Sequence, residues 1–412
     1  MNPAKDEDQA AELTQSRVQL HGRFSARILA SEIAVLLLQC LLALAIFLPA
    51  IRAGHVDFRN MYTAGYMVRA GHCREIYDTA AQKFFQNRLV SKESLPLPFI
   101  RPAYQALFYL PFSLLPFRQA YFLFLALNLG ILFECMKLLH PDTPNLARIN
   151  FCLPALLFLY PPITVALMQG QDSILLLAAL VGAYACLRRD REYAAGALVA
   201  LGLFKFQLVI PIFLLFLAWR RWRFSAAFAG VLVALAAISI GIVGVAPLIR
   251  YFQSLMGAGS SLGSVAGFTL RMNLMGNLHG AFSTLLKGSS LVLPLTAAAS
   301  AATMILVAFR RPRGADALLI AIPASALVSY YLYPHDMCIL ILPIVVMLDR
   351  LTGLGKEKYR FRRAQIFAAV LLFIAPFILI FALNQFWLAS LPLLAFAVVI
   401  AARPSTAAQS TP

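Results

Sequence analysis

The sequence predicts an all-α protein that crosses a membrane many times. Of its 412 residues, 61% are hydrophobic and only 13% are charged, which is not the composition of a water-soluble globular domain. Several apolar runs approach the length of about twenty residues that a helix needs to cross a bilayer. The formal net charge of +17 comes from short basic clusters at the ends of these runs, where such residues set topology and contact lipid headgroups.

The chain begins with a polar segment, residues 1–26, which we expect to be a cytoplasmic tail. The first apolar run, about 27–49, is too long for a signal peptide and lacks a cleavage signature, so we expect a retained span. The polar stretch 50–100 then emerges on the outer face. Residues 27–402 form a single transmembrane domain in this interpretation, and 403–412 form a second cytoplasmic tail.

The later apolar segments cannot all cross the membrane. If they did, the cluster RRDR at 188–191 would face outward, although short basic loops stay inside. Segment 103–117 has about fifteen residues, too few for the ~30 Å hydrocarbon core, so we expect it to be re-entrant or interfacial. The remaining candidates are 118–138, 149–168, 171–187, 194–217, 224–247, 290–309, 315–333, 336–350, 364–383 and 385–402.

Segment 194–217 is expected to fold back as a hairpin of two half-helices. The clusters RRDR and RRWR flank it, both favour the cytoplasm, and the run is interrupted at Lys205, Gln207 and Pro211. About ten full crossings then remain, and every short basic loop, including RRPR at 310–313, lies on one side.

The outer face then collects the most polar junctions of the chain. These are the loop around Asp57, the turn Gln169-Gly170-Gln171-Asp172, a second outer loop at 248–289 containing RMNLMGN, and the junction YPHD at 333–336. None of these junctions is a basic topology cluster. A shared outward-facing site is the simplest interpretation.

Several stretches occur in an order and spacing typical of one family. They are DFRNMYTAG through IYD at 57–78, RPAYQALFYLPFSLLPF at 101–117, LMQGQDSILLL at 167–177, AAGALVALGLFKFQLVIP at 194–211, RRWR at 220–223 and YPHDMCILILP at 333–343. From about residue 30 to 350 the chain resembles glycosyltransferase family 87, although RPAY and RMNLMGN depart from the usual pattern. The resemblance implies a GT-C fold at the cell membrane. It also implies inverting transfer of mannose or another hexose from a polyprenyl phosphate on the outer face, without a nucleotide.

Asp57 is the predicted general base. A carboxylate within hydrogen-bond reach of an acceptor hydroxyl is the common device for removing its proton, and inversion needs only one such group. The resemblance assigns the same role to this aspartate. The alternative is that Asp57 only caps the helix predicted for FRNMYTAGYMVRAG, since aspartate is favoured at that position.

His335 and Asp336 lie where one predicted span ends and the next begins, after the aromatic run 330–333. Titratable groups at such depth are costly and therefore candidates for function. His335 is predicted to be catalytic, either binding a lipid phosphate as imidazolium or assisting the leaving group, and the resemblance supports this assignment. The alternative is an interfacial loop in which the histidine caps a helix.

Three cations are predicted to bind the donor phosphate. Lys205 lies deep in its apolar run, where an ammonium needs a partner, although snorkelling to the headgroups is the alternative. Arg101 and Arg271 are further cations on the outer side. The predicted sugar or acceptor contacts are Arg59, Asn60, Tyr62, Gln169, Gln171, Asn273 and Asp336.

Other classes of protein fit poorly. The six cysteines have no metal-type spacing, and the chain contains no HExxH, GxSxG, glycine-rich phosphate loop or Rossmann fingerprint, so no metal or cofactor is expected. Nucleic acid is not an expected partner, because no basic domain stands apart from the spans. The expected partners are a polyprenyl-phosphate sugar, a glycolipid or glycan acceptor, and the bilayer, with the oligomeric state left open.

Two competing functions remain. A transporter or flippase of a lipid-linked saccharide would also use broken helices and charges at membrane depth, but we find no clear two-fold repeat of spans. An assembly scaffold would leave Asp57 and Lys205 unexplained.

Overall fold

The computed structural model describes residues 43–92, 97–148, 152–257, 271–352 and 362–401, with the isolated positions 34, 37, 38 and 41. Every element in these ranges is a helix, as predicted. The predicted tails 1–26 and 403–412, most of the first span and part of the 248–289 loop lie outside the described residues.

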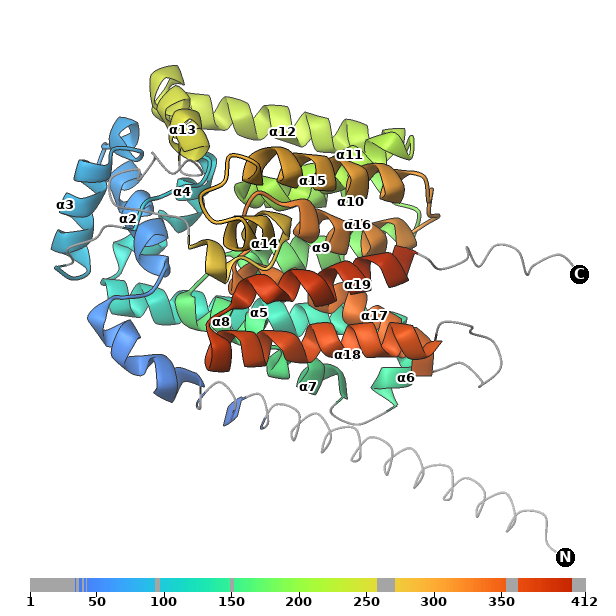
Figure 1. The fold of residues 1–412 in the computed structure, drawn as a ribbon. Helices are drawn as coiled ribbons and strands as arrows, with labels where there is room; N and C mark the ends of the chain where they lie inside the picture. Colours follow the sequence, from blue (N-terminus) through green and yellow to red (C-terminus); the bar gives the residue numbers. More distant parts are fainter. Residues whose placement is uncertain are drawn as a thin grey trace, which may run out of the picture.

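A bundle of long helices carries a group of shorter helices at one end (Figure 1). We call that group the cap; it contains α2 (Phe58–Arg69), α3 (Thr79–Leu89) and α4 (Tyr104–Tyr109). The bundle contains α5 (Phe117–Leu139), α9 (Ser173–Leu187), α10 (Glu192–Leu201), α11 (Phe206–Ala218), α12 (Trp222–Val243), α15 (Val292–Ala308), α16 (Asp316–Val328), α17 (Ile341–Thr352), α18 (Arg362–Ile378) and α19 (Ser390–Ala401). Shorter helices connect them: α6 (Pro144–Ala147), α7 (Cys152–Leu159), α8 (Pro161–Gln169), α13 (Val245–Gly257) and α14 (Leu278–Leu285).

Within the described residues, three helical runs have the length and composition to cross a membrane: Phe117–Asp142, Glu192–Ala218 and Trp222–Val243. Helix α5 alone has 23 residues and extends for about 35 Å, enough for the ~30 Å hydrocarbon core. Six shorter apolar helices accompany these runs: Ala43–Ala53, Ser173–Leu187, Val292–Ala308, Asp316–Val328, Arg363–Ile378 and Phe386–Ala401. The prediction of a helical membrane protein is confirmed, whereas the count of about ten crossings and the GT-C connectivity stay predictions.

Segment 103–117 forms no long helix, as its length predicted. It contains the six-residue helix α4 and a 3-10 turn at Phe112–Leu114, and α5 begins at Phe117. Helix α4 packs closely on α2 at Gly65, where an added Cβ would lie 2.6 Å from the backbone of Tyr109. The segment therefore belongs to the cap.

The chain folds back within 194–217 as predicted, whereas the re-entrant place of this hairpin in the bilayer stays a prediction. A 3-10 turn at Gly202–Lys205 separates α10 from α11. A straight helix over the 27 residues of this run would hold its ends about 40 Å apart. Instead, Arg221 Nε, just after the run, lies 2.8 Å from Glu192 Oε1 at its start. The chain therefore folds back at the 3-10 turn.

The basic clusters meet at the end of the bundle away from the cap. Arg221 of the cluster RRWR pairs with Glu192, the residue after RRDR. It also donates a hydrogen bond to the carbonyl of Gly314, the residue after RRPR, 3.2 Å away. Arg188 pairs at 2.8 Å with Asp142, which lies just beyond the far end of α5. The loops at 188–191, 220–223 and 310–313 therefore gather at one end as predicted, whereas most of the fourth basic cluster, 350–363, lies outside the described residues. That this side is cytoplasmic stays a prediction.

Candidate functional site

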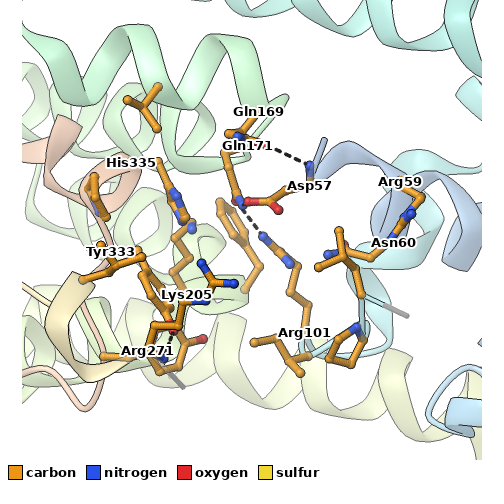
Figure 2. A pocket seen from close by; sticks show the side chains of 18 of the residues that line it. Asp57, Arg59, Asn60, Arg101, Gln169, Gln171, Lys205, Arg271, Tyr333 and His335 are labelled. Carbon is orange, nitrogen blue, oxygen red and sulfur yellow. Dashed lines mark hydrogen bonds between the residues drawn. The ribbon is translucent and has the colours of Figure 1, made fainter. Parts of the chain in front are cut away.

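A cavity of about 580 Å³ lies where the cap meets the bundle, within the size range usual for small-molecule sites. Figure 2 shows its labelled side chains converging from both parts. It is lined by His55, Asp57, Arg59, Asn60, Leu97, Pro98, Ile100, Arg101, Val165, Gln169, Gln171, Phe204, Lys205, Arg271, Leu274, Tyr331, Tyr333, Pro334 and His335. The four polar junctions predicted to share a site therefore do come together.

Asp57 holds the cap position of α2, but its carboxylate makes no capping hydrogen bond. Instead, Asp57 Oδ2 accepts a hydrogen bond from Gln171 Nε2 at 2.5 Å (Figure 2). The backbone N–H of Asp57 donates to Gln169 Oε1 at 3.3 Å. The alternative of a purely capping aspartate is therefore not supported, because the side chain faces the cavity and the turn that follows α8.

That turn depends on Gly170, which ends α8 with a left-handed backbone at φ +61°. Glycine adopts this conformation without steric cost. A Cβ added at Gly170 would also lie 2.7 Å from the Cβ of Phe58, the residue after Asp57. Close packing at this glycine thus brings Gln169 and Gln171 within reach of Asp57.

A buried network of charges lies beneath the cavity. Arg101 pairs with Asp172, with Nη2 at 3.1 Å from Oδ1 and a second, shorter contact through Nε. Lys205 Nζ lies 3.1 Å from Asp172 Oδ1 and 2.5 Å from Asp336 Oδ1. Both carboxylates are fully buried, and buried charges persist only when paired and hydrogen-bonded in this way. Asp172 was missed as a site residue, although an aspartate at the start of an apolar run was a usable signal.

The cations Lys205 and Arg271 lie across the cavity from Asp57, together with His335 (Figure 2). The His335 ring stacks on that of Tyr333, with centroids 6.0 Å apart, and its Nε2 lies 3.6 Å from Asp336 Oδ1. Burial lowers the pKa of His335 below its ordinary value despite the neighbouring carboxylate. This shift favours neutral imidazole over the imidazolium at neutral pH.

Three predicted sugar or acceptor contacts do not line this cavity. The Tyr62 hydroxyl donates to the carbonyl of Leu115 at 2.8 Å, because the ring packs on Phe117 at the start of α5. Asn273 Nδ2 donates to the carbonyl of Asn384 at 3.3 Å, and Asp336 is buried against Lys205. The other predicted site residues all line the cavity, and sequence analysis missed His55 and Tyr331 there.

The described part of the chain contains no group of three His, Cys, Asp or Glu side chains placed to hold a metal ion.

The model of one protein family, glycosyltransferase family 87, matches residues 99–340, which is more than half of the chain. No curated protein and no solved structure matches this chain. The matched range includes the buried charge network and begins after Asp57.

Proposed function

Since the chain belongs to glycosyltransferase family 87, we propose that it transfers a hexosyl group, mannosyl by family resemblance, from a polyprenyl-phosphate sugar. The acceptor is a lipid or glycan hydroxyl, and no nucleotide takes part. We place the site on the outer face of the cell membrane, because the basic clusters gather at the opposite end of the bundle.

One observation carries the proposal: Asp57 is the single carboxylate among the described residues that line the cavity. Asp172 and Asp336 are fully buried and bound to cations, so neither can readily accept a proton from an acceptor. Asp57 is held by side-chain amides and faces the open space. It is therefore the group best placed to act as general base.

In the proposed reaction, an acceptor hydroxyl gives its proton to the Asp57 carboxylate as its oxygen attacks the anomeric carbon. The bond from that carbon to the phosphate oxygen breaks, and its electron pair stays on the polyprenyl phosphate. The cavity lining described here offers no second carboxylate to form a covalent glycosyl intermediate, so the product has inverted configuration.

The cations opposite Asp57 suit the leaving phosphate. Arg271 and Lys205 provide positive charge on that side, although two buried carboxylates offset the charge of Lys205. Tyr333 and His335 provide polar groups beside them. Charge that develops on the phosphate is stabilised most by groups already held in place. Lys205 is held in this way by its two buried carboxylates.

The test is a transfer assay with purified protein in lipid nanodiscs, labelled polyprenyl-phosphate mannose and an extract of membrane glycolipids. We expect loss of donor, release of polyprenyl phosphate and an acceptor carrying the inverted sugar. Asp57→Asn should lower turnover roughly 10²- to 10⁴-fold while donor binding persists. Normal transfer by a folded Asp57→Asn variant would remove Asp57 from the mechanism.

Asp78→Asn is the matched control. Asp78 belongs to the same outer segment and caps α3 by accepting from the backbone N–H of Ala81 at 2.8 Å. Asparagine caps helices about as well, so this variant should keep its activity. If the donor crosses the bilayer of a sealed vesicle without being consumed, the protein is a flippase and not a transferase.

A further inference from the structure

Both ends of the Gln171 side-chain amide are engaged. Its Nε2 donates to Asp57 Oδ2 at 2.5 Å, and its Oε1 accepts from Arg101 Nη2 at 2.9 Å. A guanidinium only donates hydrogen bonds, so the amide oxygen must face Arg101 and the NH2 group must face Asp57. The side chain is only 4% exposed, which leaves it little freedom to turn.

We propose that Gln171 is a positioning residue, which holds the Asp57 carboxylate in one orientation while Arg101 anchors the amide. The inference rests on the proposed role of Asp57 as base. It gives Gln171 a different role from the sugar contact predicted from sequence. A hydrogen bond donated to a carboxylate favours its charged form, and a base acts only from a defined position.

The anchor is rigid because it is itself part of the buried network. Arg101 is bound through two nitrogens to Asp172, which also accepts from Gln105 Nε2 at 3.1 Å. A chain of contacts therefore runs from Asp172 through Arg101 and Gln171 to Asp57. Asp172 directly follows Gln171 in the chain, so one turn supplies two of the four residues in this chain of contacts.

The same turn also holds the backbone of the base. Gln169 accepts from the Asp57 N–H at 3.3 Å, so the main chain and the carboxylate of Asp57 are each bound by one glutamine of the turn. Gly170 makes this double contact possible by its left-handed backbone and its packing on Phe58. Two independent contacts to one residue indicate placement of Asp57, beyond simple packing of the turn.

Other charged or titratable groups share the cavity with Asp57. They are His55, Arg59, Arg101, Lys205, Arg271, Tyr333 and His335. Substitution of Gln171 leaves all of them in the chain. A change in the pH dependence of turnover would therefore report the lost amide.

The test compares kcat against pH for wild type and Gln171→Met, which keeps the length of the side chain but removes the hydrogen bonds. We expect kcat to fall roughly 10- to 100-fold and its acid limb to move up by as much as about one pH unit. Donor KM should change little. Gln171→Glu keeps an acceptor for Arg101 but places a like charge beside Asp57. The acid limb of kcat for Gln171→Glu should therefore move up further than the acid limb for Gln171→Met.

Ser173→Ala is the control for a merely structural loss. Ser173 begins α9 directly after the turn and donates to Asp336 Oδ1 at 3.2 Å, so its removal disturbs the network without touching Asp57. The acid limb of kcat for Ser173→Ala should lie at the same pH as in wild type. Gln171→Glu replaces Gln171→Met in the comparison if the latter does not fold.

A second measurement repeats Gln171→Met in the Asp57→Asn background by single-turnover assay. If Gln171 acts through Asp57, the second substitution adds little further loss. An unmoved acid limb, or an equal loss in both backgrounds, would overturn the positioning role. Failure of the proposed function would look different, because Asp57→Asn alone would then transfer normally.

Discussion

Removal of the Lys205 ammonium should destabilise the protein strongly. Lys205 is 4% exposed and lies 2.5 Å from Asp336 and 3.1 Å from Asp172. In Lys205→Ala, Asp172 keeps Arg101, whereas Asp336 keeps Ser173 and the His335 imidazole, whose Nε2 lies 3.6 Å away, but no permanent cation. Removing one partner of a buried ion pair typically costs about 3–5 kcal/mol, because the other charge stays buried without its counterion.

The assay is thermal unfolding in detergent, in which size-exclusion chromatography measures the fraction of folded protein that remains at each temperature. Lys205→Ala should lower the apparent melting temperature by several degrees, and Lys205→Met combined with Asp336→Asn should recover most of the loss. Lys137→Met is the matched control: its ammonium lies 2.8 Å from Glu134, but both side chains are more than half exposed. Such a pair contributes at most about 1 kcal/mol. Equal losses from Lys205→Ala and Lys137→Met would refute the reasoning.

Three further predictions follow from the cavity and the topology. An anionic donor raises the pKa of His335 on binding, so donor KM should increase as pH rises through the pKa of the complex. His335→Gln should flatten this dependence of KM on pH. An unchanged profile in that variant would place the phosphate elsewhere. Gly170→Ala should cost about 1–3 kcal/mol in the free energy of unfolding and reduce kcat, because the new Cβ meets Phe58. A variant with the melting temperature and turnover of wild type would contradict this packing. An impermeant thiol reagent should label Cys73 from outside but not Asp190→Cys in a Cys73→Ser background, and the reverse pattern would invert the topology.

The hairpin shows what could be predicted from sequence. Lys205, Gln207 and Pro211 interrupt one apolar run, and basic clusters flank it on both sides. The bilayer acts on each segment separately: length, hydrophobicity and flanking charge decide whether a run crosses or turns back. These local quantities determined the helical class, the short segment at 103–117 and the shared end of the basic loops.

The roles within the cavity depended on packing. Lys205 was predicted to bind phosphate, but only the fold shows that it is held by Asp336, which is 131 positions away. Tyr62 was predicted to be an acceptor contact from its place beside Asp57, yet its ring packs on Phe117 and its hydroxyl donates to the Leu115 carbonyl. No local pattern in the sequence encodes such contacts.

By itself, therefore, the sequence determined the membrane frame and the set of polar junctions that meet at one end of it. The tertiary structure decided which of those groups face the cavity and which neutralise one another beneath it. The physical reason is that pairing of buried charges is compulsory, but the choice of partner depends on distances between helices far apart in the chain. Gln171, 114 positions from Asp57, is the clearest case: its spacing marked a turn, and only the fold placed its amide on the base.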